Sequence, residues 1–399
     1  MSTSPARLES VASLFGDVYG TLPNSLADAP GRVEVIGNHT DYNGGSVVGA
    51  ALERGTAVAM GLRADGRIRL ISDTRQEAVP VETTMTSFTS ERLPDWCAYP
   101  LGVIDEARLN GWVPEGAGLD LAIHSTLPIG AGLASSAALE LAVAGALVPL
   151  FFEAGNEPGT EMLVAAAHRA ENRFVGMPCG LLDQTVVGHA REDHLIVMDA
   201  ATNRHDVVPI PSSLGFVLFQ SHVSHALVTS PYEERHRECR QALMGLQRFI
   251  PGLRHLASVH PADLDAYGSV LETRPRMRAQ HVVEEQVRVL AFQEALRNGK
   301  PETAGALMSA SHESSRLLFD NSTPELDVLV ASASQQENVL GARLSGGGWG
   351  GTVVALVRDT FSDHQAESIC DTYEELFEVR PHWWRSRACR GLVQERLEP

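Results

Sequence analysis

The sequence predicts an α+β fold, and three observations support this class. In the first half of the chain, short strand-like and helix-like segments alternate without a regular repeat. The second half carries longer helical patterns, and near its end a glycine-rich stretch separates two strand-like runs. A doubly wound α/β fold would instead show regular strand–helix alternation. At ~150 residues per domain, the 399 residues correspond to about two to three domains.

The first half combines three strand patterns with two helical patterns. Alternating apolar and polar residues predict strands at 33–36, 66–71 and 119–123. Apolar residues at helical spacing predict helices at 137–148 and 162–171. The first of these helices is apolar on nearly every side, so we expect it to be buried.

A polar stretch that contains two prolines predicts a domain boundary. It covers residues 203–213 and separates two short apolar runs, at 195–198 and 216–219. We therefore expect two domains of similar size, formed by residues 1–208 and 209–399. In the second domain, helices are predicted at 232–249, 282–296 and 325–335, and strands at 342–344 and 353–357.

The composition excludes several classes of protein. Among the 32 basic residues there is a single lysine, Lys300, and it precedes a proline. A Walker P-loop and a protein-kinase site each need a positioned lysine, so both are excluded. Schiff-base and pyridoxal-phosphate chemistry are disfavoured for the same reason. A formal net charge of −18 leaves no excess of basic residues for binding nucleic acid.

The cysteines and the apolar segments indicate a cytoplasmic protein. The five cysteines are widely spaced and contain no Cys-x-x-Cys pair, which argues against a disulfide framework or a zinc site. The first residues contain no apolar segment typical of a signal peptide. The longest apolar run, 137–152, includes Glu140 and Pro149 and is too short to cross a membrane. We therefore expect no membrane partner.

A glycine loop at residues 127–136 is a candidate phosphate site. Gly130 and Gly132 allow the backbone to approach a ligand closely, and Ser135 and Ser136 begin the apolar helix. The free N–H groups at a helix start favour an anion. No lysine or arginine lies between residues 108 and 169, so backbone donors, serine hydroxyls and Mg²⁺ would have to hold the phosphates. Taken alone, the same pattern also fits a tight strand-to-helix connection.

The segment 29–45 is the candidate sugar site. It holds Arg32, Asn38, His39 and Asp41 among several glycines. Carboxylate, imidazole and amide groups can fix the directions of hydroxyl groups, so such a set suits a polyol. The structural alternative is a simple turn capped by Asp41.

An aspartate in apolar surroundings is the candidate catalytic base. Asp183 follows the turn at 176–180. Such a carboxylate either caps a helix or acts as a base kept ionised by a cation.

Four segments together resemble the GHMP small-molecule kinases, and most closely their galactokinase branch. The glycine loop is similar to Pro-x-x-x-Gly-Leu-x-Ser-Ser-Ala, and the sugar segment to Gly-Arg-Val-Asn-Leu-Ile-Gly-Glu-His-Thr-Asp-Tyr-Asn-Gly-Gly. Residues 176–184 resemble Gly-x-Pro-Cys-Gly-x-x-Asp-Gln, and residues 341–351 resemble the third motif, Gly-Ala-Arg-Met-Thr-Gly-x-Gly-Phe-Gly-Gly. With weaker matches, the resemblance covers nearly the full chain.

The resemblance implies a two-domain fold with the active site in the cleft between the domains. It implies phosphorylation of the anomeric hydroxyl of a hexose, most simply galactose, with ATP as co-substrate and Mg²⁺ as cofactor. The implied catalytic residues are Asp183, as base, and Arg32, which would pair with Asp183 and stabilise charge on the transferred phosphoryl group. The residues implied in sugar binding are Asn38, His39, Asp41 and Tyr232. For ATP they are Trp96, Gly130, Gly132, Leu133, Ser135 and Ser136, and for the metal Ser136 and Glu171. No nucleic-acid partner is implied, and the oligomeric state stays open, a monomer included.

Two positions depart from the galactokinase pattern. Glu34 stands where the pattern has Asn, and Asn38 stands where it has Glu. A neutral amide at position 38 loses the charge-assisted part of a hydrogen bond to a sugar hydroxyl. This leaves a GHMP kinase for a related or modified sugar as an alternative. A second alternative is a catalytically silent sensor of sugar and ATP, although Ser135, Ser136 and Asp183 are all present.

Overall fold

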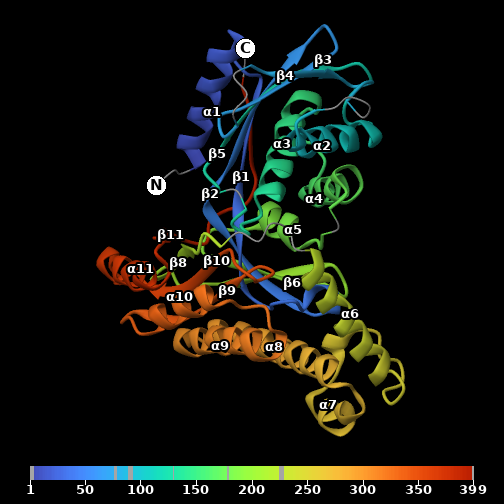
Figure 1. Cartoon of the computed structure of the whole chain (residues 1–399). Coiled ribbons are helices and arrows are strands. Elements are labelled where there is room, and N and C mark those ends of the chain that lie inside the picture. Colours follow the sequence, from blue (N-terminus) through green and yellow to red (C-terminus); the bar gives the residue numbers. More distant parts are fainter. Residues whose placement is uncertain are drawn as a thin grey trace.

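The chain folds around two β-sheets, which confirms the α+β class (Figure 1). This computed structural model describes residues 4–75, 79–88, 93–128, 130–177, 179–223 and 229–397. Every strand and helix predicted from the sequence lies within or overlaps an observed element.

The first sheet has eight strands in the order β12-β1-β2-β5-β3-β4, with β6 paired to β2 and β7 to β6. Its long strand β2 pairs with β6 through its first residues and with β5 through its last ones. All of its pairings are antiparallel except that of β3 with β5. The strands are β1 (Ser25–Ile36), β2 (Ser46–Arg63), β3 (Arg67–Ser72), β4 (Val81–Thr84), β5 (Gly118–Ser125), β6 (His194–Asp199), β7 (Arg204–Pro209) and β12 (Val393–Arg396).

Helices cover both faces of this sheet. Helix α1 lies on one face and α2 to α5 lie on the other (Figure 1). The apolar helix α3 packs against β1 and β2, and every residue from 137 to 148 except Leu139 is buried. The helices are α1 (Ser4–Tyr19), α2 (Ala98–Leu109), α3 (Ser135–Phe151), α4 (Thr160–Arg169) and α5 (Leu182–His189).

The second sheet has four antiparallel strands in the order β11-β8-β10-β9. Helices α10 and α11 pack on one face through Leu326, Leu329 and Ile369. On the other face, Phe292 of α8 and Met308 of α9 share a core with residues of both sheets. The strands are β8 (Leu214–Gln220), β9 (Val339–Ser345), β10 (Thr352–Arg358) and β11 (His382–Ser386). The helices are α6 (Thr229–Leu246), α7 (Pro261–Tyr267), α8 (Thr273–Arg297), α9 (Pro301–Ser314), α10 (Pro324–Ser334) and α11 (Asp363–Phe377).

The predicted domain boundary at residues 203–213 is not a simple linker, because part of it forms a strand. Residues 204–209 form β7, an edge strand of the first sheet. The last strand, β12, returns to the first sheet and pairs with β1, although it lies far beyond residue 208. The shared core and this returning strand join the two halves, so the division of the chain at residue 208 stays a prediction.

Short helical segments of other types interrupt the regular elements. The helix predicted at 162–171 ends as an α-helix at Arg169 and continues as a π-helical turn, η3. A second π-helical turn, η6, follows α9. Such turns are frequent at functional sites. The segments are η1 (Asp41–Asn43), η2 (Asp95–Cys97), η3 (Ala170–Val175), η4 (Leu256–Ser258), η5 (Gly268–Val270) and η6 (Ser315–Phe319). Over the residues described, no helix is both long and apolar enough to span a membrane.

Candidate functional site

A cavity of 210 Å³ brings together every residue that was predicted to be catalytic or sugar-binding. Its walls come from β1, the loop after β1, the start of α5, the start of α6 and the loop between β9 and β10. The lining residues are Arg32, Glu34, Asn38, His39, Asp41, Cys179, Gly180, Leu182, Asp183, Tyr232, Gly346 and Gly347. A larger cavity of 610 Å³ adjoins it, and the two share Asp41, Cys179, Gly180 and Tyr232.

Strand β1 places two charged side chains on the cavity side. Arg32 and Glu34 are two residues apart, so they face the same side of the strand, while Val33 and Val35 pack in the core. The pairing of β1 with β2 is irregular on both sides of this segment, between Pro30 and Arg32 and again after Glu34. Such bulges often re-aim side chains beside active sites.

Arg32 and Asp183 form a partly buried ion pair, which confirms the predicted pairing. Arg32 Nε donates to Asp183 Oδ1 at 2.8 Å, and Nη2 donates to the same oxygen. The remaining nitrogen, Nη1, donates to the carbonyl of Gly132 in the glycine loop at 2.9 Å. Burial lowers the pKa of the Arg32 guanidinium, but the adjacent Asp183 outweighs this and raises it overall. Arg32 therefore stays charged between the carboxylate and the glycine loop.

Asp41 is a carboxylate enclosed by the cavity wall. Burial raises the pKa of Asp41 to about 6, and the negative charges of Glu34 and Asp183 act in the same direction. A Cβ atom on Gly180 would lie only 3.3 Å from Asp41 Oδ2, so a glycine at that position leaves room for the carboxylate. Asp41 is therefore a hydrogen-bond acceptor that becomes a donor in mildly acidic solution.

His39 is held firmly by its protein partners. Its Nε2 donates to the Gly347 carbonyl at 2.9 Å, and Nδ1 lies 3.2 Å from the hydroxyl of Tyr42. The ring stacks on Phe319 at 4.4 Å between centroids. Burial lowers the pKa of His39 to about 3, so the ring is neutral. Both nitrogens are engaged within the protein, and a sugar contact by His39 stays a prediction.

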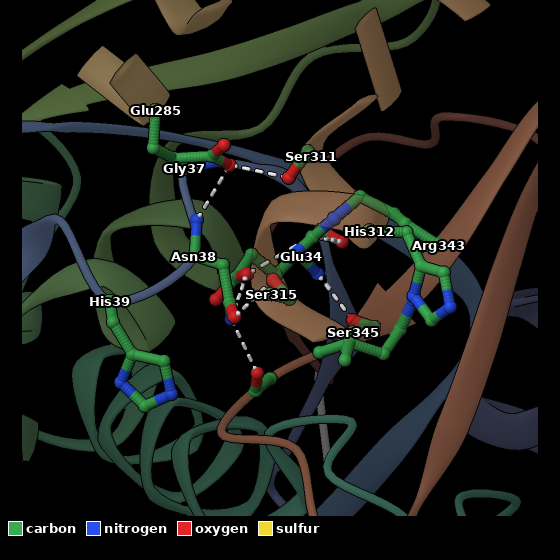
Figure 2. Close-up of polar contacts among 12 residues, drawn as sticks. Glu34, Gly37, Asn38, His39, Glu285, Ser311, His312, Ser315, Arg343 and Ser345 are labelled. Atoms are coloured by element: carbon green, nitrogen blue, oxygen red, sulfur yellow. Dashed lines mark hydrogen bonds and ion pairs between the residues drawn. The ribbon is translucent and has the colours of Figure 1, made fainter. Parts of the chain in front are cut away.

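The loop that carries Asn38 and His39 is anchored by a buried glutamate that the sequence did not reveal. Glu285 of α8 accepts hydrogen bonds from the backbone N–H groups of Gly37 and Asn38 at 3.0 and 3.1 Å (Figure 2). It also accepts from Ser311 Oγ at 2.5 Å and from Arg288 Nε at 2.7 Å. Burial raises its pKa, but Arg288 and its other partners outweigh this and lower the pKa of Glu285 to about 2. No motif marks Glu285, because nothing along the chain distinguishes it from the other two glutamates of this long helix.

Glu34 and Asn38, the two residues that depart from the galactokinase pattern, contact each other. Asn38 is completely buried, and its Nδ2 donates to Glu34 Oε1 at 3.0 Å. Glu34 is also paired with Arg343 of β9 at 3.1 Å. Asn38 was predicted to bind the sugar, whereas Glu34 was not placed in the site. The two-residue spacing from Arg32 on a strand was the signal that could have identified Glu34.

The glycine loop is shaped as expected for a close backbone approach. Gly130 and Gly132 have φ angles of 73° and 72°, and Ala134 caps α3 with a φ of 55°. Ala134 gives no side-chain cap to the helix start, which leaves Ser135 and Ser136 in its first turn. The loop carbonyl of Ala131 accepts a hydrogen bond from Thr352 Oγ1 at 2.8 Å, so the third motif supports this loop.

Trp96 lines neither of the two cavities. Trp96 is 7% exposed and belongs to the apolar cluster that includes Phe88 and Leu101, so its predicted proximity to adenine stays a prediction. The main chain of Leu133 accepts a hydrogen bond from Arg32 N at 3.0 Å. Ile129 and Pro178 lie outside the described residues.

Glu171 forms a buried polar cluster with Glu140 and Gln184. Gln184 Nε2 donates to Glu171 Oε2 at 2.6 Å and to Glu140 Oε2 at 3.2 Å. The other oxygens, Glu140 Oε1 and Gln184 Oε1, are buried without a hydrogen-bond partner. Glu140 lies one helical turn after Ser136, so the two share a face of α3. Burial and the charge of Glu171 raise the pKa of Glu140 well above its ordinary value.

Three family models match the chain. The galactokinase galactose-binding signature matches residues 13–62, the GHMP kinases N terminal domain matches 98–191, and the GHMP kinases C terminal domain matches 292–378. These matches cover the sugar segment, the glycine loop with Asp183, and the third motif.

Curated proteins and solved structures show the same similarity. The chain is 34% identical to a galactokinase of Bacillus subtilis over 94% of each chain. It is 37% identical to a galactokinase of Roseiflexus over 90% of each chain. A crystal structure of Lactococcus lactis galactokinase complexed with galactose superposes with a TM-score of 0.89 at 29% identity, over 97% of this chain and 99% of that one. A mevalonate kinase with a TM-score of 0.65 and 17% identity shares the fold, over 91% of this chain and 98% of that one.

Proposed function

We propose a mechanism that starts from one premise: this chain belongs to the galactokinase family of the GHMP kinases. On that premise it transfers the terminal phosphoryl group of ATP to the anomeric hydroxyl of galactose, giving galactose 1-phosphate and ADP. The observation that carries the proposal is a single network. Arg32 joins the carboxylate of Asp183 to the glycine loop at Gly132, inside the cavity that holds the sugar-segment residues.

In this mechanism Asp183 is the general base. Asp183 Oδ2 is free of the ion pair formed by Oδ1, and the side chain is 30% exposed on the cavity side. It can therefore accept the proton of the anomeric hydroxyl, while Arg32 holds Oδ1 in place. The same guanidinium contacts the glycine loop, where it can stabilise negative charge on the phosphoryl group in transfer.

The phosphates of ATP would be held without lysine. The N–H groups at the start of α3, the hydroxyls of Ser135 and Ser136, and the positive φ angles of Gly130 and Gly132 suit an anion. Lys300 lies between α8 and α9, outside both cavities of the site. Arg32 is thus the cation closest to this loop in the network described.

The residues near Glu171 fit Mg²⁺. Magnesium prefers oxygen ligands and usually combines one or two carboxylates with water and phosphate oxygens. Glu171 and Ser136 would hold it, and the unpartnered oxygens of Glu140 and Gln184 are consistent with an oxygen-rich site. When bound, the ion would offset the negative charge of the phosphates. Gln184 orients the two carboxylates by donating to both.

An ADP-release assay across several sugars tests the proposed function. We expect galactose to give the highest kcat/KM in a panel that includes N-acetylgalactosamine, 2-deoxygalactose, glucose and arabinose. No turnover of galactose would contradict the proposal. A higher kcat/KM for N-acetylgalactosamine or 2-deoxygalactose would favour the alternative of a kinase for a modified sugar.

The pH dependence of sugar use is expected to follow Asp41. Because its pKa is raised to about 6, the carboxylate is ionised above that pH and protonated below it. The ionised form accepts hydrogen bonds from sugar hydroxyls, so kcat/KM for galactose should fall as the pH decreases through about 6. Asp41→Asn should have a lower kcat/KM at neutral pH and should lack this step in the profile.

The stability of Asp41→Asn provides a control, because the contribution of Asp41 to stability changes with pH in the opposite direction to its contribution to kcat/KM. A folded pKa of about 6, above the ordinary 3.8, means that Asp41 favours folding below pH 3.8 and that this contribution is lost as the pH rises through 6. The variant should therefore be at least as stable as the wild type in urea at pH 8. A less stable variant, or an unchanged step near pH 6, would contradict the assignment.

A further inference from the structure

The side-chain amide of Asn38 has no free hydrogen-bonding position (Figure 2). Nδ2 donates to Glu34 Oε1 at 3.0 Å and to the Gly346 carbonyl at 2.7 Å. Oδ1 accepts from Ser315 Oγ at 3.0 Å and from Asn321 Nδ2 at 2.8 Å. An amide side chain offers two donors and two lone pairs, so all four positions are occupied. Asn38 is also 0% exposed, so it can bind a sugar only by giving up a protein partner.

Glu34, in contrast, has one carboxylate oxygen fixed and the other open. Oε1 accepts from Asn38 and from Arg343. Across the described part of the chain, no hydrogen bond reaches Oε2. Oε2 is also not fully enclosed, because it does not belong to the buried polar atoms that lack a partner. The residue lines the cavity beside Arg32 and Asp183, and its side chain is 10% exposed. Oε2 is therefore a carboxylate acceptor that faces the 210 Å³ cavity.

A buried arginine explains why one of the two positions must carry a carboxylate. Arg343 is 0% exposed, and its Nε and Nη2 have no hydrogen-bond partner. Among the residues described, Glu34 is the carboxylate that pairs with it. A second carboxylate at position 38 would face Glu34 Oε1 and the Gly346 carbonyl, which are both acceptors. Relative to the galactokinase pattern, the carboxylate and the amide have therefore changed places between positions 34 and 38, whose side chains contact each other.

We propose that Glu34 is the specificity-determining residue of this site and that Asn38 is a positioning residue that acts through it. This inference rests on the proposed function. Glu34 Oε2 accepts a hydrogen bond from one hydroxyl of the bound hexose, while Asn38 and Arg343 hold Oε1 in place. The substrate class is a neutral hexose with a free hydroxyl at that point. A sugar that carries a carboxylate there is rejected, because its charge would meet the like charge of the largely buried Glu34 side chain.

The test combines the E34Q variant with deoxy sugars. We measure kcat/KM for galactose and for its 2-, 3-, 4- and 6-deoxy analogues with the wild type and with E34Q. For galactose, E34Q should lower kcat/KM by roughly 10- to 100-fold, because a charged acceptor is lost. For the one analogue that lacks the partner hydroxyl, E34Q and wild type should have similar kcat/KM. A structural role alone would instead lower all five values by the same factor.

A double exchange separates the role of Glu34 from its support of Arg343. E34N/N38E keeps one carboxylate beside Arg343, whereas E34N removes it and N38E places two carboxylates in contact. The double variant should therefore unfold at a higher urea concentration than either single variant. If E34Q does not fold, E34N/N38E takes its place in the sugar panel. The decrease in its kcat/KM relative to wild type must then again depend on a single hydroxyl of the sugar.

Three outcomes would overturn the inference. The first is a uniform loss with E34Q across all the sugars. The second is a uniform loss with E34Q together with a hydroxyl-specific loss with Asn38→Ala, which would make Asn38 the direct contact. In both cases wild-type turnover of galactose leaves the proposed function intact. The third is a wild type that neither turns over nor binds any of these hexoses, which overturns the proposed function as well.

Discussion

Asp183→Asn lowers kcat for galactose by about 10²- to 10⁴-fold, the usual contribution of a positioned general base. The amide has nearly the same shape as the carboxylate but cannot take a proton from the anomeric hydroxyl. Arg32 Nε can still donate to the oxygen of the asparagine, so the cavity should keep its shape. The measurement is the steady-state rate of ADP release at saturating galactose and ATP.

Binding measurements separate this catalytic effect from misfolding. Galactose should bind Asp183→Asn with a Kd within a few-fold of the wild-type value in calorimetry, because the sugar-segment residues are untouched. A kcat within about 10-fold of wild type would show that Asp183 is not the base. Equal losses of kcat and of galactose affinity would indicate a binding role instead.

Glu285→Ala lowers the free energy of unfolding by about 3–5 kcal/mol, as expected when one partner of a buried ion pair is removed. The substitution removes the acceptor of Arg288 Nε and of the backbone N–H groups of Gly37 and Asn38. The sugar affinity should fall as well, because these two backbone groups begin the loop that carries His39 and Asp41. Urea unfolding and galactose calorimetry measure the two effects.

The neighbouring residue Glu284 gives a matched control. It lies on the same helix and pairs with the same Arg288 at 3.5 Å, but its side chain is 41% exposed. Glu284→Ala should change the free energy of unfolding by less than about 1 kcal/mol. Similar losses for the two alanine variants would contradict the anchoring role of Glu285.

The effect of Glu285→Ala should also depend on pH. The folded pKa of Glu285 is lowered to about 2 from the ordinary 4.5, so its contribution to stability is full above pH 4.5. That contribution is lost as the pH falls toward 2. The difference in stability between wild type and Glu285→Ala should therefore shrink over this interval. A difference that stays constant would mean that the carboxylate charge is not what holds the loop.

The local patterns were sufficient for the elements and for the residues of the main motifs. The apolar helix at 137–148 and the strands at 119–123 and 353–357 are all observed, because burial periodicity and glycine positions are local properties. The ion pair between Arg32 and Asp183 was also predicted correctly. Both residues stand in distinctive motifs, and an arginine and an aspartate at one reacting centre have complementary charges.

Residues outside the motifs could not be assigned in this way. Glu285 lies on an ordinary helical pattern, and nothing in its neighbours along the chain indicates that it reaches the segment with Gly37 and Asn38. Arg343 stands in the third motif, but nothing along the chain indicates that it pairs with Glu34. Asn38 shows the same limit for a residue that does stand in a motif. As a residue of the sugar pattern it was expected to bind substrate, but tertiary contacts occupy its whole amide.

The sequence by itself determined the fold class, the glycine loop, the candidate base and the absence of a lysine-dependent phosphate site. The tertiary structure alone decided that the Asn38 amide is fully hydrogen-bonded within the protein, whereas one oxygen of Glu34 accepts no hydrogen bond among the residues described. Residues 34 and 38 are close in the chain, but their roles depend on Arg343, Ser315 and Asn321, which lie more than 270 positions away. A hydrogen bond is specified by direction and distance in space, so only the fold shows that Asn38 is saturated and that Glu34 is free.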